Sequence, residues 1–395
     1  MTGASGRPDV IVVGGGIVGT SAAAFLAAGG ARVVLVEREG LAAAASGANS
    51  GVVQHPFDPV LAALYRRTVE LYRDLAALEL GFRLGSLPAG MLFVSADEGP
   101  ARRQAALIGA AFPTLRVDVA GGSELKRLEA RLAEDLWACR VDIGYPVAPG
   151  ASTYAYATLA EARGAELHQG RTATLDVEGD RVVGVRIDGR RLSSGSVLVA
   201  AGPWSSLLVD PGGRWRPIVA RWGVVAEVEL DEPPAHVLEE AGIDAAIGVP
   251  DPIVVDEGAA EASGIARDPG DGDQVDFSLV PLPGASAVGS TFLAAEPDPR
   301  AWMEPILVRA ARFVPSVAAA PIRGTRCCAR PQSVDGRPLV GRIPGLDGAF
   351  ICAGHGAWGI STGPGSARLA ADLILRGEAA IPAELDAARF GPPRA

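Results

Sequence analysis

The first forty residues contain the feature that most constrains the fold of this chain. A run of mostly β-branched residues at 9–13 leads directly into a glycine-rich segment at 14–19 with the spacing G-x-G-x-x-G. The run predicts a buried parallel strand, and the small residues at 20–28 predict a helix. A second apolar strand is predicted at 32–36, and Glu37 follows it directly. Together these parts predict a β-α-β unit that binds a dinucleotide.

Each glycine of this motif has a physical task. Gly14 allows the tight turn, Gly16 lets backbone N–H groups approach a pyrophosphate, and Gly19 lets the helix lie close to the strand. The helix N-terminus supplies partial positive charge to the phosphates. The Glu37 carboxylate can accept hydrogen bonds from a ribose diol, and its charge disfavours a 2′-phosphate. The motif by itself does not distinguish FAD from NAD.

Composition argues against several classes of function. The chain has 395 residues, enough for two domains, and a formal net charge of −10 without a basic run, so we expect no nucleic-acid partner. Its four cysteines form no C-x-x-C pair, so we expect no metal site and no disulfide scaffold, and a cytoplasmic location. The first nine residues lack the pattern of a signal peptide, and the apolar runs are too short for a membrane span.

Three later segments favour FAD. Residues 46–55 are rich in Ser, Gly and Asn, which suit a phosphate and an isoalloxazine edge, although ordinary polar loops share this composition. An apolar strand predicted at 196–201 ends in a small-residue turn. A further strand at 349–352 leads into a glycine-rich loop, and a helix is predicted at 366–375, which Pro364 would help to start.

These segments, in this order, resemble a known family. The stretches Val10–Glu37, Ser46–His55, Val197–Ser205 and Arg330–Leu375 are similar to those of the D-amino-acid-oxidase-like FAD oxidoreductases. Within that family the chain resembles the branch of glycine oxidase and sarcosine oxidase, and most of all the dehydrogenase subunits that act on D-hydroxyproline, opines or glycine. The resemblance implies an FAD-dependent enzyme that oxidises the C–N bond of an amino acid or a related secondary amine.

The resemblance implies an α/β fold of the glutathione-reductase-like, D-amino-acid-oxidase type. A Rossmann-like FAD domain would be combined with a second, α+β substrate domain built on a mixed sheet. Strand-like runs at 224–230, 277–281 and 286–292 agree with such a sheet, and Asp268 to Asp273 predicts an exposed turn. The expected boundaries are 1–85, 145–210 and 325–395 for the FAD domain and 86–144 and 211–324 for the substrate domain.

The resemblance also implies which residues contact the FAD, which we expect to be bound non-covalently. They come from the dinucleotide motif, the polar loop, the turn after the strand at 196–201, and the C-terminal loop. The expected cofactor-binding residues are Gly14, Gly16, Ile17, Val18, Gly19, Glu37, Arg38, Ser46, Ala48, Asn49, Ser50, Gly51, Ala201, Gly202, Trp204, Arg330, Gly354, Gly356, Trp358, Gly359, Ile360, Ser361 and Thr362.

Arg330 is the first predicted catalytic residue. It begins a segment, Arg330–Pro338, that resembles the family pattern R-P-x-x-x-D-G-x-P, in which the Arg binds the substrate carboxylate. A planar guanidinium grips a carboxylate at two points and would fix the α-carbon over flavin N5, whereas the alternative is a surface Arg before a turn. The N–H groups of residues 360–363 would face the flavin N1–C2=O edge, where negative charge develops when hydride reaches N5. The amine would become an imine, which water hydrolyses.

The remaining candidates each have two interpretations. His55, the second predicted catalytic residue, either faces the substrate pocket or is a hydrogen-bonded structural histidine. His355 is expected to shape the C-terminal loop, and Trp222 and Trp358 either line the pocket or pack in the core. Cys328 falls where sarcosine-oxidase-like enzymes attach their flavin through a cysteine sulfur, so covalent FAD is the alternative to non-covalent binding.

The sole lysine of the chain, Lys126, bears on the electron acceptor. Sarcosine-type oxidases use a lysine near the flavin to activate oxygen, but Lys126 is expected in a surface helix at 123–135. This weakens the case for a fast reaction with oxygen without excluding it. The expected partners are therefore an amine or amino-acid substrate and either oxygen or another electron acceptor, and a homo-oligomer is compatible with the sequence.

Two competing functions stay open. The first is FAD-dependent oxidation of a 2-hydroxy acid or glycerol phosphate, because the run at 49–52 occurs in such relatives and Arg214, Arg216 and Arg221 would suit a phosphate. The second is a flavin subunit of a hetero-oligomeric amine dehydrogenase, whose turnover depends on partner chains.

Overall fold

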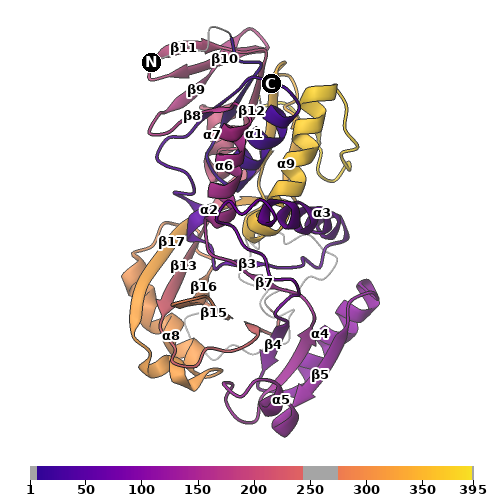
Figure 1. The fold of residues 1–395 in the computed structure, drawn as a ribbon, viewed down its shortest axis with the longest axis vertical. Coiled ribbons are helices and arrows are strands. Elements are labelled where there is room, and N and C mark those ends of the chain that lie inside the picture. The colour runs from indigo at the N-terminus through magenta and orange to yellow at the C-terminus, as the bar shows by residue number, and fades with distance from the viewer. Residues whose placement is uncertain (1–6, 243–274, 394–395) are drawn as a thin grey trace.

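Two sheet-based regions form the molecule in a computed structural model that describes residues 7–242 and 275–393 (Figure 1). A six-stranded sheet lies in the upper region of Figure 1, and an eight-stranded sheet lies in the lower region. Between them pair two short strands, β3 (Val52–Val53) and β7 (Tyr145–Pro146). The segments that connect the two regions therefore run through the middle of the molecule.

The six-stranded sheet has the strand order β18–β19–β12–β1–β2–β8. The five strands from β19 to β8 are parallel to one another, and β18 is antiparallel at the edge. Because the parallel strands share one direction, their carboxyl ends meet at the same edge of the sheet, where α/β proteins bind ligands. The strands are β1 (Val10–Val13), β2 (Val33–Val36), β8 (Glu166–His168), β12 (Ser196–Val199), β18 (Leu339–Arg342) and β19 (Ala349–Ala353).

Both faces of this sheet are covered. Successive side chains of a strand point to opposite faces, so alternate residues of β1 pack on opposite sides. Val10 and Val12 pack among helices, whereas Ile11 and Val13 pack on the side of a three-stranded antiparallel sheet. Burial on both faces explains why β1 and β2 are continuous apolar runs. The helices are α1 (Ile17–Ala28), α3 (Pro59–Ala76), α6 (Ala151–Ala162) and α9 (Gly359–Arg376), and the small sheet contains β9 (Ala173–Glu178), β10 (Arg181–Ile187) and β11 (Arg190–Ser193).

The eight-stranded sheet is mixed, with the order β17–β13–β16–β15–β14–β4–β6–β5. Its β14–β4 pair is parallel, and the others are antiparallel. Helix α8 (Met303–Ala311) packs on one face through Ile306 and Ala310, and α4 (Glu98–Ala111) packs on the other through Ile108. The strands are β4 (Met91–Ser95), β5 (Val117–Gly121), β6 (Trp137–Val141), β13 (Ile218–Val228), β14 (Val237–Glu240), β15 (Val275–Val280), β16 (Ser286–Thr291) and β17 (Ile322–Ser333).

Short helical elements complete the fold. They are the α-helices α2 (Ala45–Ala48), α5 (Gly122–Leu128) and α7 (Ser205–Val209), and 3₁₀ turns at Gly202–Trp204, Pro299–Trp302, Pro315–Ala319, Gly356–Trp358 and Ala387–Phe390. None of the helices in the described part of the chain is long and apolar enough to cross a membrane.

The predicted strands are found as β1, β2, β12, β13, β15, β16 and β19, and two predicted helices are present with different bounds. The last helix begins at Gly359, not at 366, so Pro364 lies inside it. Its glycine-rich start resembles a loop in sequence because glycine is a poor helix former. The helix that contains Lys126 ends at Leu128 rather than 135, and the lysine ammonium donates to backbone carbonyls beyond the helix end. The turn predicted at 268–273 lies outside the described residues.

The predicted domain boundaries stay a prediction. Strand β17 bears on them, because it pairs with β13 from Ile322 to Ser333 and so belongs to the eight-stranded sheet. The predicted FAD domain resumes at 325, inside that strand. The strand pairing therefore favours a boundary nearer to residue 334.

Candidate functional site

A cavity of about 530 Å³ lies between the two sheets. Its upper wall comes from the loops that follow the carboxyl ends of β1, β2, β12 and β19, and its lower wall comes from strands β13 to β17. Ligand pockets in proteins have volumes of roughly 300–1,000 Å³ and commonly lie between domains. The cavity is therefore the candidate ligand site.

The loop after β1 has the geometry expected of a phosphate cradle. Gly14 has φ of +119°, and a Cβ there would overlap the carbonyl oxygen of Ala200. Gly16 and Ile17 line the cavity at the start of α1, and the Ile17 N–H donates to Ser46 Oγ at 2.9 Å. Backbone donors and a hydroxyl thus meet at a helix N-terminus, which suits a pyrophosphate. Gly19 does not line the cavity; a Cβ there would overlap the Gly14 carbonyl oxygen, so its role is close packing.

Glu37 lies at the end of β2, on the cavity wall. Its carboxylate accepts from the Gly15 N–H at 2.6 Å and from the Glu39 N–H at 2.8 Å, which fixes it beside the glycine loop. The Arg38 guanidinium lies 4.5 Å from the ring centroid of Trp204, and both line the cavity. The acid at the end of the second strand therefore has the position that a ribose diol requires, so these residues fit the dinucleotide half of FAD.

Residues 356–361 bring the start of α9 to the cavity. The first N–H groups of a helix have no partner inside it, so Gly359, Ile360 and Ser361 present positive partial charge there. Ser361 Oγ also accepts from the Gln54 N–H at 2.9 Å. The spacing G-x-G-x-x-G recurs at 354–359, in the glycine-rich loop that the sequence predicts to contact the cofactor. The residues present thus fit a group that carries negative charge at this point, as the pyrimidine end of a flavin does on reduction.

Arg330 lies on β17 and lines the cavity from below. Its Nη1 donates to the Thr291 carbonyl and its Nη2 to Ser290 Oγ, both at 2.7 Å. The guanidinium also lies 4.4 Å from the ring centroid of Phe292. It crosses β13 over Gly223, where a Cβ would overlap the guanidinium. Arg330 is thus an oriented cation in the cavity wall rather than a freely moving surface side chain.

A buried polar pair closes another part of the cavity wall. Gln54 Nε2 donates to Glu239 Oε2 at 3.0 Å, and both side chains are buried and line the cavity. Ser278 lies opposite Glu239 on the neighbouring strand β15 and also lines the cavity. Sequence reasoning missed these three residues. The two on strands come from segments far apart in the sequence and carry no motif, so only strand pairing brings them together.

The two histidines near the motifs are buried. His55 does not line the cavity; its ring packs against Phe57, Tyr65 and Phe112, with centroid distances of 5.8, 5.0 and 5.0 Å. Burial lowers the pKa of His55 to about 4. His355 lines the cavity, and burial likewise lowers its pKa to about 4. The placement of His55 outside the cavity wall favours the structural interpretation over the predicted catalytic role.

Cys328 lines the cavity with its sulfur 3.9 Å from the Ala48 carbonyl oxygen. Burial raises the pKa of its thiol, so the thiolate form that would attack a flavin is disfavoured. Lys126 is not in the cavity wall: its Nζ donates to the carbonyls of Ala130 and Leu132. Among the residues of 7–242 and 275–393, no group of three or more His, Cys, Asp or Glu side chains is arranged to hold a metal ion.

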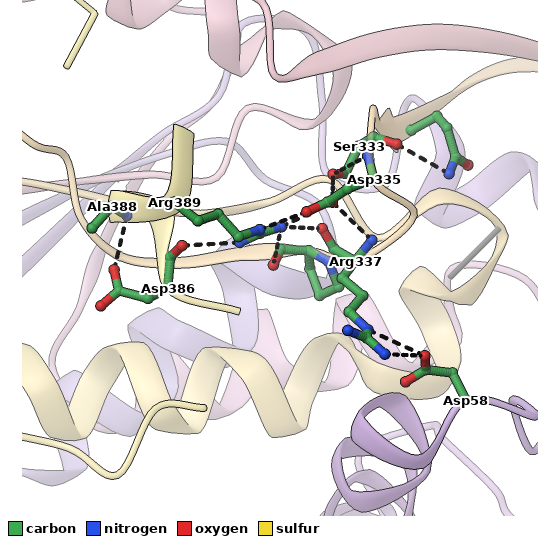
Figure 2. A network of polar contacts seen from close by, with 9 residues as sticks. Asp58, Ser333, Asp335, Arg337, Asp386, Ala388 and Arg389 are labelled. Carbon is green, nitrogen blue, oxygen red and sulfur yellow. Dashed lines mark hydrogen bonds and ion pairs between the residues drawn. The ribbon is translucent and has the colours of Figure 1, made fainter. Parts of the chain in front are cut away.

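A polar network holds the segment after Arg330 in place (Figure 2). Asp58 caps α3 by accepting from two backbone N–H groups at 2.9 Å, and its other oxygen accepts from Arg337 at 2.7 Å. Arg389, near the C-terminus, pairs with Asp335 and donates to the Arg337 carbonyl. Figure 2 shows these side chains linking the loop after β17 to the start of α3. The network therefore fixes the loop between β17 of the eight-stranded sheet and β18 of the six-stranded sheet.

Nineteen of the residues predicted to contact the cofactor come together in the cavity wall. They are Gly14, Gly16, Ile17, Val18, Glu37, Arg38, Ser46, Ala48, Asn49, Ser50, Ala201, Gly202, Trp204, Arg330, Gly356, Trp358, Gly359, Ile360 and Ser361. Four others do not line it, namely Gly19, Gly51, Gly354 and Thr362, and Thr362 instead donates to the Trp358 carbonyl. Arg214, Arg216 and Arg221 also lie outside the wall, so the structure gives no support to glycerol phosphate as the substrate. Trp222 does not line the cavity either.

Comparison with known proteins supports the same assignment. Residues 9–373 match the family model described as FAD dependent oxidoreductase (DAO). The chain is 30% identical to a D-amino acid dehydrogenase of Rhizobium johnstonii over 248 residues, which is 60% of this chain and 51% of that protein. It is 29% identical to glycine oxidase of Pseudomonas aeruginosa over 199 residues, 50% of this chain and 46% of that protein. The matched region thus spans about half the length of these curated relatives.

A solved structure extends the likeness to the whole chain. Glycine oxidase from Geobacillus kaustophilus matches with a TM-score of 0.77 and 24% identity, over 98% of this chain and 99% of that one. At this identity the match concerns the fold. It confirms the predicted α/β class with a Rossmann-like region and a second region on a mixed sheet.

Proposed function

The chain belongs to the DAO family of FAD-dependent oxidoreductases, and we propose that it binds FAD in the cavity and oxidises the C–N bond of an amino acid or related amine. One observation supports the substrate class most strongly: the oriented Arg330 guanidinium faces the same cavity as the first turn of α9. A carboxylate is the substrate group that such a guanidinium recognises best. The named activities of the curated relatives, D-amino acid dehydrogenase and glycine oxidase, agree with this class.

In this proposal the cofactor and the protein have separate tasks. When bound, FAD supplies the acceptor for the hydride that leaves the carbon beside the amine nitrogen. Arg330 holds the substrate carboxylate and so fixes the orientation of that carbon. The N–H groups of Gly359, Ile360 and Ser361 stabilise negative charge on the cofactor side of the cavity. The Gln54–Glu239 pair forms a polar wall that can contact the substrate amine.

We further propose that the FAD is held non-covalently by the loops after β1, β2, β12 and β19. The raised pKa of the buried Cys328 thiol supports this choice. Acid precipitation of the purified protein should leave a yellow supernatant. A yellow pellet that lost its colour in the Cys328→Ser variant would contradict non-covalent binding.

The electron acceptor is proposed to be a carrier other than oxygen. The sole lysine of the chain lies outside the cavity wall and is bound to two backbone carbonyls, so it cannot activate oxygen at the cofactor. Reduced protein should therefore regain its visible absorption slowly when air is admitted and rapidly with an artificial quinone acceptor. Rapid recovery in air alone would identify an oxidase instead.

The proposed function is tested by mixing the flavin-loaded protein anaerobically with candidate substrates and following the visible flavin band. The amine set contains D-amino acids, glycine, sarcosine, proline derivatives and opines, and a second set contains 2-hydroxy acids. Bleaching by a member of the amine set is the expected result. Bleaching by 2-hydroxy acids alone would show that the protein oxidises a C–O bond rather than a C–N bond. A protein that takes up no FAD would refute the proposal.

A further inference from the structure

Pro364 creates a defect in helix α9 beside the cavity. A proline inside a helix has no N–H for the carbonyl four residues earlier, and its ring crowds that carbonyl. In α9 the affected carbonyl belongs to Ile360, in the first turn. The first turn of α9 therefore lacks one of the hydrogen bonds that would join it to the rest of the helix.

Tyr72 on helix α3 supplies the hydrogen bond that Pro364 removes. Its hydroxyl donates to the Ile360 carbonyl at 2.8 Å, and the tyrosine is completely buried. The hydroxyl of Ser152 lies 3.4 Å from the Tyr72 hydroxyl, so the tyrosine oxygen has a second polar neighbour. Burial raises the pKa of Tyr72, which keeps its hydroxyl protonated and able to donate.

Thr68, one turn before Tyr72 on α3, binds α9 directly after the proline. The N–H of Gly365, the residue after the proline, donates to Thr68 Oγ1 at 3.0 Å. A Cβ at Gly365 would lie 2.6 Å from the Leu64 carbonyl oxygen, so the two helices touch through their backbones here. Two side chains of α3 thus bind residues on either side of Pro364 in α9.

We propose that Tyr72 and Thr68 are positioning residues that fix the first turn of α9 against the bound flavin. They do not line the cavity themselves, and they act through the Ile360 carbonyl and the Gly365 N–H. The inference rests on the proposed function, because it assigns the turn at 359–361 to the flavin. The proline leaves this turn free to be set by α3, and α3 sets the direction of its N–H groups.

The test is a double-mutant cycle on the FAD-loaded protein with Tyr72→Phe and Pro364→Ala. Sulfite is the probe, because this anion adds to oxidised flavins, bleaches the visible band and binds more tightly when positive charge lies near the flavin. A hydrogen bond contributes about 0.5–1.5 kcal/mol, so Tyr72→Phe should weaken sulfite binding by about 2- to 10-fold and lower the flavin midpoint potential. Pro364→Ala supplies an N–H at position 364 that can donate to the Ile360 carbonyl. In that background Tyr72→Phe should change sulfite binding by less than about two-fold.

A control variant separates positioning from general loss of a buried hydroxyl. Tyr156 is also buried, and its hydroxyl pairs with the Leu71 carbonyl on α3 rather than with α9. Tyr156→Phe should leave the sulfite affinity and the midpoint potential unchanged in both backgrounds. If Tyr72→Phe alone does not fold, Thr68→Val should lower the potential in its place.

The outcomes distinguish the two proposals. An equal effect of Tyr72→Phe with and without Pro364 would overturn the positioning role, although the protein still bound FAD. A wild-type protein that binds no FAD would refute the proposed function itself. A Tyr156→Phe effect as large as that of Tyr72→Phe would also overturn the positioning role.

Discussion

Arg330 depends on a neighbour that has no side chain. Its guanidinium crosses β13 directly over Gly223 and reaches Ser290 and the Thr291 carbonyl on β16. An added methyl group at Gly223 would occupy the place of the guanidinium. The glycine thus leaves the space that the guanidinium of the proposed carboxylate site occupies.

Gly223→Ala should impair carboxylate recognition while leaving Arg330 in the chain. A hydrogen bond to a charged group contributes about 1.5–3 kcal/mol, so kcat/KM for an amino acid should fall roughly 10- to 100-fold, mainly through KM. Gly109→Ala is the matched control, because Gly109 lies in α4 with open space at its Cβ position. Unchanged kinetics for Gly223→Ala would contradict the placement of Arg330.

His55 should matter for stability rather than for catalysis. Its pKa is lowered to about 4, so the folded state holds it neutral. As the pH falls from 6.5 to 4, the unfolded state gains the proton first, and the folded state loses about 3 kcal/mol of its relative stability. In His55→Phe the fall in unfolding free energy between pH 7 and pH 4 should be smaller by that amount.

The measurement is denaturant unfolding of the two proteins at both pH values, with steady-state kinetics at pH 7. His168→Gln serves as control, because the His168 side chain is 40% exposed on β8. At this partly exposed position the substitution should change the unfolding free energy at pH 7 by less than about 0.5 kcal/mol. A large loss of kcat in His55→Phe at pH 7 would restore the catalytic role predicted from the sequence.

Among the elements, α3 joins the two halves of the site. Its first residues are capped by Asp58, which also binds Arg337 from the loop after β17, and its later residues reach α9. Asp58 is 4% exposed, so removing it would lose a cap and leave a guanidinium without its carboxylate in a largely buried place.

Asp58→Ala should therefore destabilise the fold by about 3 kcal/mol. Asp97→Ala is the natural comparison, because Asp97 precedes α4 but its side chain makes no capping hydrogen bond. Because Asp97 is exposed, Asp97→Ala should change the unfolding free energy by less than about 0.5 kcal/mol. Equal effects of the two substitutions in chemical denaturation would show that the cap and the ion pair contribute nothing.

At the element scale, the sequence predicts some features better than others. The strands β1 and β2 could be predicted from the sequence because burial on both faces makes them continuous apolar runs. The start of α9 could not be predicted, because its glycines and Pro364 are poor helix formers. Tertiary contacts from Tyr72 and Thr68 support the helix there. Local propensity and local pattern contain no information about those contacts.

For the whole molecule, the cavity wall combines residues from both sheets. The cofactor loops were predictable because each follows a strand with a recognisable glycine pattern. Glu239 and Ser278 were not, because they meet only through pairing between β14 and β15. The part of the site that would select the substrate therefore depends on long-range topology, whereas the part that would hold the dinucleotide depends on local motifs.

FAD should stabilise the molecule more than FMN does. The dinucleotide motif and Glu37 would contact the ADP half of FAD, which FMN lacks. A ligand at a hundredfold excess over its Kd adds about 2.7 kcal/mol, which raises the unfolding temperature in thermal scans of the apoprotein. Equal shifts with FAD and FMN would contradict the assignment of the loop at 14–19.

The measurement that tests the account most directly is the anaerobic rate of flavin bleaching by an amino acid and by the matching amine without its carboxylate. The wild-type protein should be bleached much faster by the amino acid. Arg330→Ala should lose about 2–5 kcal/mol of this preference, so that both compounds bleach it slowly and at similar rates. Equal rates for the two compounds in the wild type, or an unchanged preference in Arg330→Ala, would contradict the central claim.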